Sequence, residues 1–453
     1  MIYKKTRLLI ALLLPAALGV AQQKQQDSTH RLSVKQSIDY ALSHQTNVVN
    51  AQYEVEKAGD KVREVVGIGL PQVSASGTVE DFLNIPTTLI PAQFFGGPAG
   101  EFEPVKFGTQ YNTSGEIDAS QLLFDGTYIV GLEASRTYKE LSQKSLTQTK
   151  IQTVSAVTKA YYTVLVNYWK LQMVHADVNR LKELMDQTEA MYKSGFTEKI
   201  DWERIKVNYN NLKTQETTIG KLVGLSYQLL KFQMGMPQHD SLSLSDSLKT
   251  LSLNPSAEKD SSFRPENRIE YSLAQTNMRA NELQLQKDRF SYLPNLALFG
   301  TWSYAAYGNT FSVFDRSQDW FPTSIVGLKM NVPVFSGFQR MYRVKEDKIG
   351  VLESEATLNN IKEGIYLEVS NSLTSLENAL ADLKNQQENM DLAQNVEHDS
   401  KIKYEAGTGS NIEVVDAETS LTEAETNYYN ALFNALVAKV DYEQAKGTLY
   451  NKK

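Results

Sequence analysis

Residue types that can perform catalysis are present, but their spacing does not assemble a reaction centre. The five histidines are scattered without the short spacings that bring metal ligands together. The segment "GTGS" at 407–410 lacks the strand-before, helix-after context of a phosphate-binding loop. Glu101 and Glu103 could form the carboxylate pair of a glycosidase, but they lie in a proline-rich loop without an evident scaffold. We predict a protein that is not an enzyme, with no catalytic residues, cofactor or metal.

One acidic pair has a helical spacing. Glu413 and Asp416 are three residues apart and would share one face of a helix. The pair follows a turn at Gly407 and Gly409, in a region that has no proline from Phe335 to Lys453. As two solvated acids in the first turn of a helix, they would be favourable neighbours of its amino-terminal dipole. Any further role of this pair depends on the structure that the turn and its flanking helices form.

The turn belongs to an internal duplication. Residues 191–202, "MYKSGFTEKIDW", match residues 403–414, "KYEAGTGSNIEV", at an offset of 212. This places Gly195 opposite Gly407. The same duplication relates "LLFDG" to "PVFSG" and "LPQVSA" to "LPNLAL" further upstream. The chain therefore consists of two copies of one plan.

Each copy begins with a helical segment that ends at a Leu-Pro pair, because proline cannot continue a helix. These helices are expected at 33–69 and 266–292. An extended stretch follows, and then "FDG" or "FSG" opens a long helix. The strand–helix junctions are Pro71, Gly126, Pro294 and Gly337.

Alternation of apolar and polar residues predicts strands between these junctions. It is clear in residues 295–305 and 325–334, and weaker in 72–80 and 110–124. The two copies would thus supply four strands. Residues 81–107 are rich in proline and are expected to form a loop.

After the "FDG" and "FSG" motifs the apolar period changes to three and four, as in a coiled-coil seam. Segments 127–191 and 338–403 would be helices of about 100 Å, and segments 198–234 and 410–446 would each run about 55 Å. Glycines between them would turn each long helix back, since glycine readily adopts the left-handed conformation that ends a helix. The hairpin-tip glycines are Gly195, Gly407 and Gly409.

The amino terminus has the features of an export signal. Residues 1–21 contain three bases, an apolar run and a Gly-Val-Ala end suited to cleavage. A signal-anchor helix is the alternative, although Pro15 and a core of about a dozen apolar residues make it short for a bilayer span. Cleavage would remove the three bases and change the net charge from -7 to -10. This balance argues against nucleic acid as the partner.

Any membrane crossing would have to use strands. Beyond the signal we find no apolar run of the ~20 residues that a membrane-spanning helix needs. Four strands cannot close a membrane barrel, because the smallest single-chain examples have about eight. The strands would therefore have to be shared among subunits.

The doubled plan resembles the TolC-like outer-membrane efflux family over about residues 33–450. The resemblance rests on the Leu-Pro before a strand, the "F-x-G" that opens a long helix, and "YEAGTGSNIEVVDA" at the second turn. It implies a mainly helical homotrimer with membrane β-strands. Four strands per chain would join a shared twelve-stranded barrel in the outer membrane, and long coiled-coil helices would form a tunnel across the periplasm.

The family plan divides the chain into four parts. These are a signal peptide at 1–21, a first repeat at 22–235, an inter-repeat segment at 236–265 and a second repeat at 266–453. In the family an equatorial belt surrounds the tunnel, and the inter-repeat segment would lie in it. A flexible linker is the alternative for that segment.

The resemblance also implies a pore constriction at the tunnel's periplasmic tip. By position after the tip glycine, the family's acidic pair corresponds to Glu413 and Asp416. Three subunits would bring six carboxylates near the axis, and such a ring favours cations and can be neutralised by them.

A gate linkage is implied as well, at Asp201 and Tyr404, where family members join neighbouring coils in the closed state. The family's arginine two residues after the tip glycine is Gly409 here. The linking base is therefore absent, or it is replaced by another base such as Lys199 or Lys401.

The function implied is a passive exit duct of a tripartite efflux or type I secretion system. Such a duct takes cargo from an inner-membrane pump through a periplasmic adaptor, contacts outer-membrane lipid and performs no catalysis. A trimeric coiled-coil adhesin or other surface or periplasmic structural protein is the alternative. It would use long helices but would not need duplicated strand pairs with their junction motifs.

Overall fold

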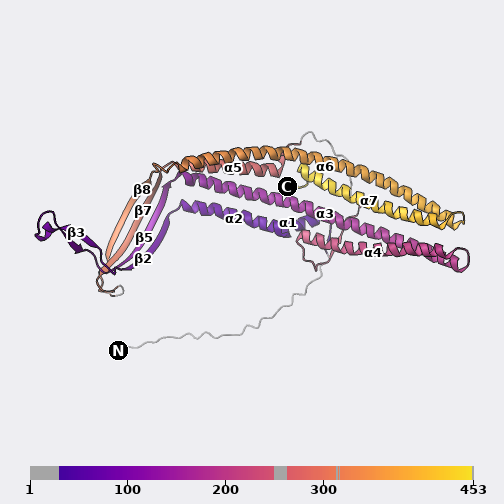
Figure 1. Cartoon of the computed structure of the whole chain (residues 1–453), viewed down its shortest axis with the longest axis horizontal. Helices are drawn as coiled ribbons and strands as arrows, with labels where there is room; N and C mark the ends of the chain where they lie inside the picture. Colours follow the sequence, from indigo (N-terminus) through magenta and orange to yellow (C-terminus); the bar gives the residue numbers. More distant parts are fainter. Residues whose placement is uncertain (1–29, 249–262, 313–314, 316, 451–453) are drawn as a thin grey trace, which may run out of the picture.

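The computed structural model describes residues 30–248, 263–312, 315 and 317–450. The expected signal peptide at 1–21 lies outside the described residues. The molecule is elongated, with a sheet at one end and a bundle of long helices running away from it (Figure 1). The chain passes twice through the same order of helix, strands, long helix and returning helix, as the duplication predicts.

The first pass contains four helices. They are α1 (Val34–His44), α2 (Thr46–Ile68), α3 (Gly126–Lys193) and α4 (Lys199–Met234). The single helix expected over 33–69 is wrong in one respect, because the chain is extended at Gln45, with φ -67° and ψ 126°. The Gln45 side chain caps α2 by accepting a hydrogen bond from the Val48 amide at 3.2 Å.

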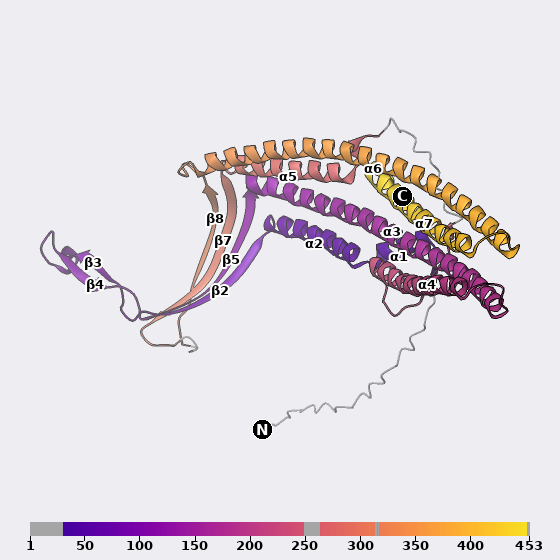
Figure 2. The ribbon, with the colours of Figure 1, turned by 45° about the vertical axis from the view of Figure 1, so that its right-hand side comes forward.

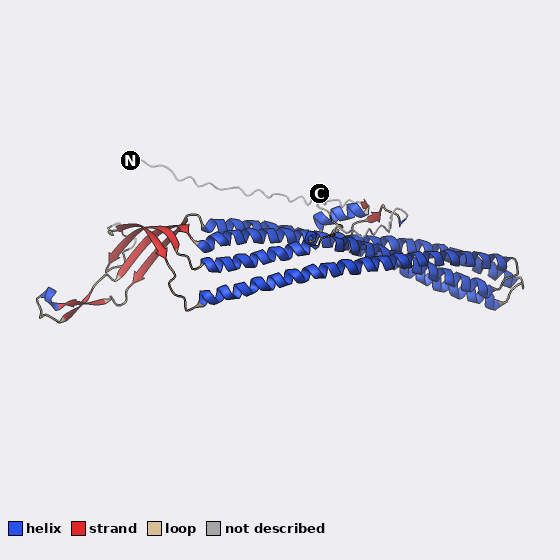
Figure 3. Ribbon diagram, turned by 90° about the horizontal axis from the view of Figure 1, so that it is seen from above, coloured by secondary structure: helices blue, strands red, loops and turns tan. Residues whose placement is uncertain are grey.

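The second pass contains three long helices. They are α5 (Ile269–Phe290), α6 (Gln339–Glu405) and α7 (Asn411–Lys446). The helix predicted to start at residue 266 starts later, because a 3-10 turn, η3 (Pro265–Asn267), precedes α5. In both passes the returning helix packs against the preceding long helix, and Figure 3 shows the two hairpins extending together to the end farthest from the strands.

Four strands form the main sheet. They are β2 (Gln72–Asp81), β5 (Tyr111–Phe124), β7 (Asn295–Gly308) and β8 (Phe321–Asn331). The sheet is antiparallel in the order β2-β5-β7-β8, so strands from the two repeats meet at its centre. The strand predicted over 325–334 was misplaced at both ends: β8 starts earlier and stops before Pro333, which has no amide hydrogen for the ladder.

The pairing register gives the sheet two different faces. On β8 the side chains of Val326, Leu328 and Met330 share one face, and they are 65–80% exposed. Their partners on β7 are Gly300, Leu298 and Leu296, so the apolar face continues across the pair.

The same face continues through the first repeat. It carries Val73, Ala75, Ala119, Ile117 and Trp302, in the register in which Val73 opposes Ala119 and Ile117 opposes both Ala75 and Trp302.

The opposite face is mainly polar, although Phe299 and Ile325 also lie on it. Ser74 opposes Asp118, Ser76 opposes Glu116, and Ser303 opposes Glu116 from the other side. The Thr301 hydroxyl donates a hydrogen bond to Asp118 Oδ1 at 2.7 Å across this face. The weak alternation of the first-repeat strands thus falls in phase with the clear alternation of the second.

Two smaller β structures flank the main elements. Residues 81–107, expected as a loop, include a hairpin of β3 (Thr87–Pro91) and β4 (Phe102–Lys106), joined through the 3-10 turn η1 (Ala92–Phe95). It projects beyond the end of the sheet that is far from the helices (Figure 2).

The second small structure lies beside the helices. β1 (His30–Leu32) pairs in parallel with β6 (Leu242–Leu244), so part of the segment 236–265 is ordered against the start of the first repeat. Leu242 and Leu244 pack on a core that includes Tyr161 and Leu230.

Two apolar clusters stabilise the helical part. One surrounds Tyr161, Val164 and Leu230 near β6, and the other surrounds Val178, Ile205 and Val414 towards the tips. Burying a large aliphatic side chain stabilises a fold by about 1.5–3 kcal/mol. The second cluster contains side chains from α3, α4 and α7, so it holds the two hairpins against each other.

Candidate gate at the helical tips

Both hairpins reverse at a left-handed glycine. Gly195 has φ 82° and Gly407 has φ 73°, and an added Cβ would meet open space at either position. The turns close in the same way: the Phe196 amide donates to the Met191 carbonyl at 2.9 Å, and the Thr408 amide donates to the Lys403 carbonyl at 2.9 Å. These bonds satisfy carbonyls that the helix ends would otherwise leave unpaired.

Glu413 and Asp416 lie in the first turns of α7, on its exposed side. The Ser410 hydroxyl oxygen caps this helix by accepting a hydrogen bond from the Glu413 amide at 3.3 Å. Val414 and Ala417, on the other side of the same turns, are buried. The two carboxylates therefore face away from the chain's own core, towards solvent or another molecule.

Asp201 and Tyr404 also reach the tips, but they do not bond to each other within the chain. Asp201 Oδ2 accepts a hydrogen bond from the Thr197 hydroxyl at 2.8 Å, and its main-chain carbonyl accepts one from Asn411 Nδ2, in the side chain, at 3.4 Å. The Tyr404 hydroxyl is buried without a hydrogen-bond partner, against the cluster that contains Ile205. Asp201 thus connects the two tips through Asn411.

The turn at Gly409 has little room for a side chain. A Cβ there would lie 3.0 Å from the Tyr404 amide nitrogen and 3.0 Å from the Lys403 Cβ. An arginine at this position would require the turn to shift. Lys199, one of the possible replacement bases, forms an ion pair with Glu203 at 2.7 Å on its own helix.

A buried charged cluster above the tips was not anticipated from the sequence. Arg180 on α3 forms an ion pair with Glu418 on α7, with Arg180 Nε 3.0 Å from Glu418 Oε1. Arg180 Nη2 also donates to Asp177 Oδ1 at 2.9 Å. Glu397 on α6 and Glu425 on α7 complete the group, and all four acids are buried. We call these five residues the Arg180 cluster.

Sequence reasoning missed this cluster because its members come from three helices. The available signal was local: Asp177 and Arg180 flank Val178 and Leu181 of the apolar row, where charged side chains are costly to bury. Burial raises the pKa values of Asp177 and Glu418 above their usual range despite the nearby guanidinium. Burial, together with the charge of Asp177, raises the pKa of Glu425 to about 8.

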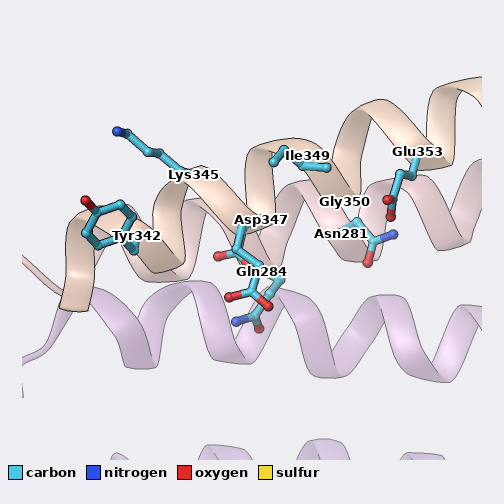
Figure 4. A pocket seen from close by; sticks show the side chains of 9 residues that line it. Asn281, Gln284, Tyr342, Lys345, Asp347, Ile349, Gly350 and Glu353 are labelled. Carbon is cyan, nitrogen blue, oxygen red and sulfur yellow. The ribbon is translucent and has the colours of Figure 1, made fainter. Parts of the chain in front are cut away.

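A groove lies between α5 and α6 near the sheet. Its volume is about 680 Å³, and Asp347, Gln284 and Asn281 point into it (Figure 4). Burial and the carboxyl group of Asp288 raise the pKa of Asp347 to about 6. Within the described residues, no group of three or more His, Asp or Glu side chains is arranged to hold a metal ion.

None of the helices in the described parts of the chain combines the length and apolarity needed to cross a membrane.

Comparisons with known proteins agree with this architecture. The family described as "Outer membrane efflux protein" matches residues 266–448. The outer membrane protein TolC of Vibrio cholerae serotype O1 is 19% identical over 341 residues, which cover 74% of this chain and 77% of that protein. The chain is similar to outer membrane efflux proteins, and its second repeat matches that family.

Solved structures support the fold of this efflux protein. The channel protein CusC superposes with a TM-score of 0.75 at 17% identity, covering 92% of this chain and 93% of CusC. The CmeC outer membrane channel of Campylobacter jejuni superposes with a TM-score of 0.71 at 15% identity, covering 92% of this chain and 86% of CmeC. The TolC-like fold predicted from the doubled motifs is confirmed.

These likenesses together indicate the class of function. An outer membrane efflux protein is a duct and not an enzyme, and its helical part lies in the periplasm. A coiled-coil adhesin or structural protein is not favoured.

Proposed function

We propose that this efflux protein acts as a homotrimer in which three four-stranded sheets close into one twelve-stranded barrel. The single observation that supports this most strongly is the sheet itself, which has one apolar face, one mainly polar face and, within the described residues, two open edges. In a bilayer every backbone polar group must be paired, so open edges at β2 and β8 require neighbours. Antiparallel pairing of β2 with β8 of the next copy would supply them.

The two faces fit this arrangement. Val326, Leu328 and Met330 would contact lipid, while Ser76, Glu116 and Ser303 would line a water-filled lumen. Lipid-facing apolar residues that alternate with polar lumen residues are the usual pattern of membrane barrels.

The constriction in this proposal is formed by Glu413 and Asp416. Both side chains are exposed on α7 in one chain, and three copies around an axis would bring six carboxylates together. Closely spaced like charges attract cations, which reduce their repulsion. Asp201 and Tyr404 would stabilise the closed tip, Asp201 through Asn411 and Tyr404 by packing on the cluster that contains Ile205.

The duct would receive cargo from an inner-membrane pump through a periplasmic adaptor that contacts the tips. Opening requires the hairpins to separate, and an adaptor can drive this only if it binds the open state more tightly than the closed one. The energy would come from the pump, since the duct performs no chemistry.

Conductance in planar lipid bilayers tests the constriction. We expect wild-type protein to give small, cation-selective currents that divalent cations reduce. Replacing both acids, Glu413→Gln and Asp416→Asn, should increase conductance and weaken divalent block by about ten-fold or more, because a loss of about 1.4 kcal/mol in binding corresponds to ten-fold.

Glu423→Gln is the matched control, since this exposed acid lies two turns further along α7. It should leave divalent block unchanged. Unaltered block in the Glu413→Gln, Asp416→Asn protein would remove the constriction from this position, and an absence of channels in wild type would reject the duct.

A further inference from the structure

The two hairpins of one chain are joined mainly along α3 and α7. These helices run antiparallel, and polar pairs connect them at matched positions. Arg180 pairs with Glu418, the Lys170 ammonium donates to Asn430 Oδ1 at 2.8 Å, and Lys159 pairs with Asp441. Movement of one hairpin relative to the other must therefore break contacts along this line.

The Arg180 cluster is the most deeply buried part of this contact. Asp177 is 1% exposed, Glu418 is 5%, Glu425 is 6% and Glu397 is 8%. Arg180 bonds to Asp177 and Glu418, and its Nε lies 3.9 Å from Glu397 Oε1. Assembly with other copies can only bury these side chains further.

The cluster contains more acids than its single base can neutralise. Arg180 is one positive charge, and four carboxyl groups surround it. Three of their oxygens are buried without a hydrogen-bond partner: Asp177 Oδ2, Glu397 Oε1 and Glu425 Oε2. Burying several unpaired carboxylates is expensive, so such a group binds protons instead.

The carboxyl group of Glu425 is the strongest proton acceptor in the cluster. Its charged neighbours are Asp177 and Arg180 on α3 and Glu418 on its own helix, and Glu397 of α6 lies near Arg180. Tyr429, one turn along α7, is a further neighbour, and burial raises its pKa to about 12, so it stays neutral. Burial and repulsion from Asp177 raise the pKa of Glu425 to about 8.

We propose that the Arg180 cluster is a proton-dependent latch between the two hairpins: a proton on Glu425 keeps α3 against α6 and α7, and its loss separates them. The effect on transport rests on the proposed function, because only in a duct would separation of the hairpins open a passage. The latch itself is a property of the single chain.

The pH dependence of the latch follows from the raised pKa of Glu425. The folded state binds the Glu425 proton more tightly than the unfolded state does, so the stabilisation is complete below the usual glutamate pKa. It is lost as pH rises through about 8. Above that pH, two adjacent carboxylates on α3 and α7 repel each other, and Arg180 compensates only part of the added charge.

Distances between spin labels on the two hairpins test the latch. The chain has no cysteine, so Glu183→Cys on α3 and Glu423→Cys on α7 can be labelled uniquely, and both positions are exposed. Labelled chains are mixed with excess unlabelled chains in detergent, so that distances within one chain dominate. We expect a longer distance to appear as pH rises from 6 to 9.5, with a midpoint near 8.

Glu425→Gln keeps the size of the side chain and its neutral state at every pH. This variant should hold the short distance throughout the range. Asp347→Asn is the matched control, because Asp347 is another carboxyl group with a raised pKa, in the groove between α5 and α6. It should retain the wild-type transition.

A second variant tests the latch by shifting the pH of the transition. Arg180→Gln removes the only base, so the hairpins should separate at a lower pH than in wild type. A pH-independent distance in wild type, or an unchanged transition in Glu425→Gln, would overturn the latch. Neither outcome depends on conductance, and a protein that forms no channels would reject the duct while leaving the distances to decide the latch.

Discussion

At the residue scale, two glycines with the same backbone conformation have different surroundings. Gly407, at the second tip, has φ 73°, and a Cβ added there would meet open space. Gly235, at the end of α4, has φ 71°, and a Cβ there would lie 2.6 Å from the His44 carbonyl oxygen. Gly235 therefore closes the contact between α4 and the break between α1 and α2. Its small size matters there as much as its conformation.

Replacing each glycine with alanine should separate the effect of the left-handed backbone from the effect of close packing. Gly407→Ala should cost about 1 kcal/mol, because a left-handed residue with a side chain is strained by about that amount. Gly235→Ala should lower the free energy of unfolding by roughly 2–4 kcal/mol, because a clash with main-chain atoms adds to that strain. Urea unfolding followed by helical circular dichroism in detergent measures both, and equal losses would contradict the packing role of Gly235.

Residue-scale features were predictable to different degrees. The positions of Gly195 and Gly407 could be predicted, because a turn inside a duplicated helical pattern has a local signal. The Arg180 cluster could not, because Asp177, Glu397 and Glu425 come together only when three helices pack. The roles of the gate linkage and constriction residues stay predictions, since a gate and a constriction would form only when several copies assemble.

At the element scale, the two long helices begin differently. α3 is capped by Asp125, whose Oδ1 accepts hydrogen bonds from the Thr127 amide at 2.7 Å and the Tyr128 amide at 3.1 Å. α6 follows Phe338, which has φ 64° and no side-chain cap. The "FDG" and "FSG" motifs therefore mark the same junction but stabilise it by different means.

Removing the cap should loosen the start of α3. Asp125→Ala should cost about 1 kcal/mol locally, which corresponds to roughly five-fold faster hydrogen exchange in the first turn. Asp125→Asn keeps an acceptor oxygen and should exchange like wild type. Unchanged exchange in Asp125→Ala would mean that packing against the sheet, and not the cap, holds this turn.

Element boundaries were predictable where proline or glycine marks them. The Leu-Pro and "F-x-G" junctions gave the strand–helix order of both repeats. The break at Gln45 and the β3–β4 hairpin were missed, because glutamine carries no strong signal for extended backbone and the prolines of residues 81–107 favoured a loop. The apolar face of β5 became clear only from its pairing with β7, and that of β2 only from its pairing with β5.

At the scale of the whole molecule, one chain is incomplete. Among the described residues, the outer edges of β2 and β8 have no partner strand, and an apolar face of the sheet is uncovered. An open sheet edge either pairs with another copy or becomes a site of aggregation. Closure by three copies would pair the edges, leave the apolar face to contact lipid and bring the acidic pairs together at the tips.

Disulfide trapping of neighbouring edge strands tests the trimeric barrel most directly. In the cysteine-free chain, Ser76→Cys on β2 is combined with single cysteines placed in turn at residues 322–330 of β8, and products are resolved by mass after outer-membrane extraction. We predict strong cross-links at a few adjacent β8 positions, with a covalent trimer as the largest product. Ser114→Cys on the interior strand β5, combined with the same scan, should give no products between copies. Only monomers from the β2 series, or ladders that extend beyond three chains, would contradict a closed trimeric barrel.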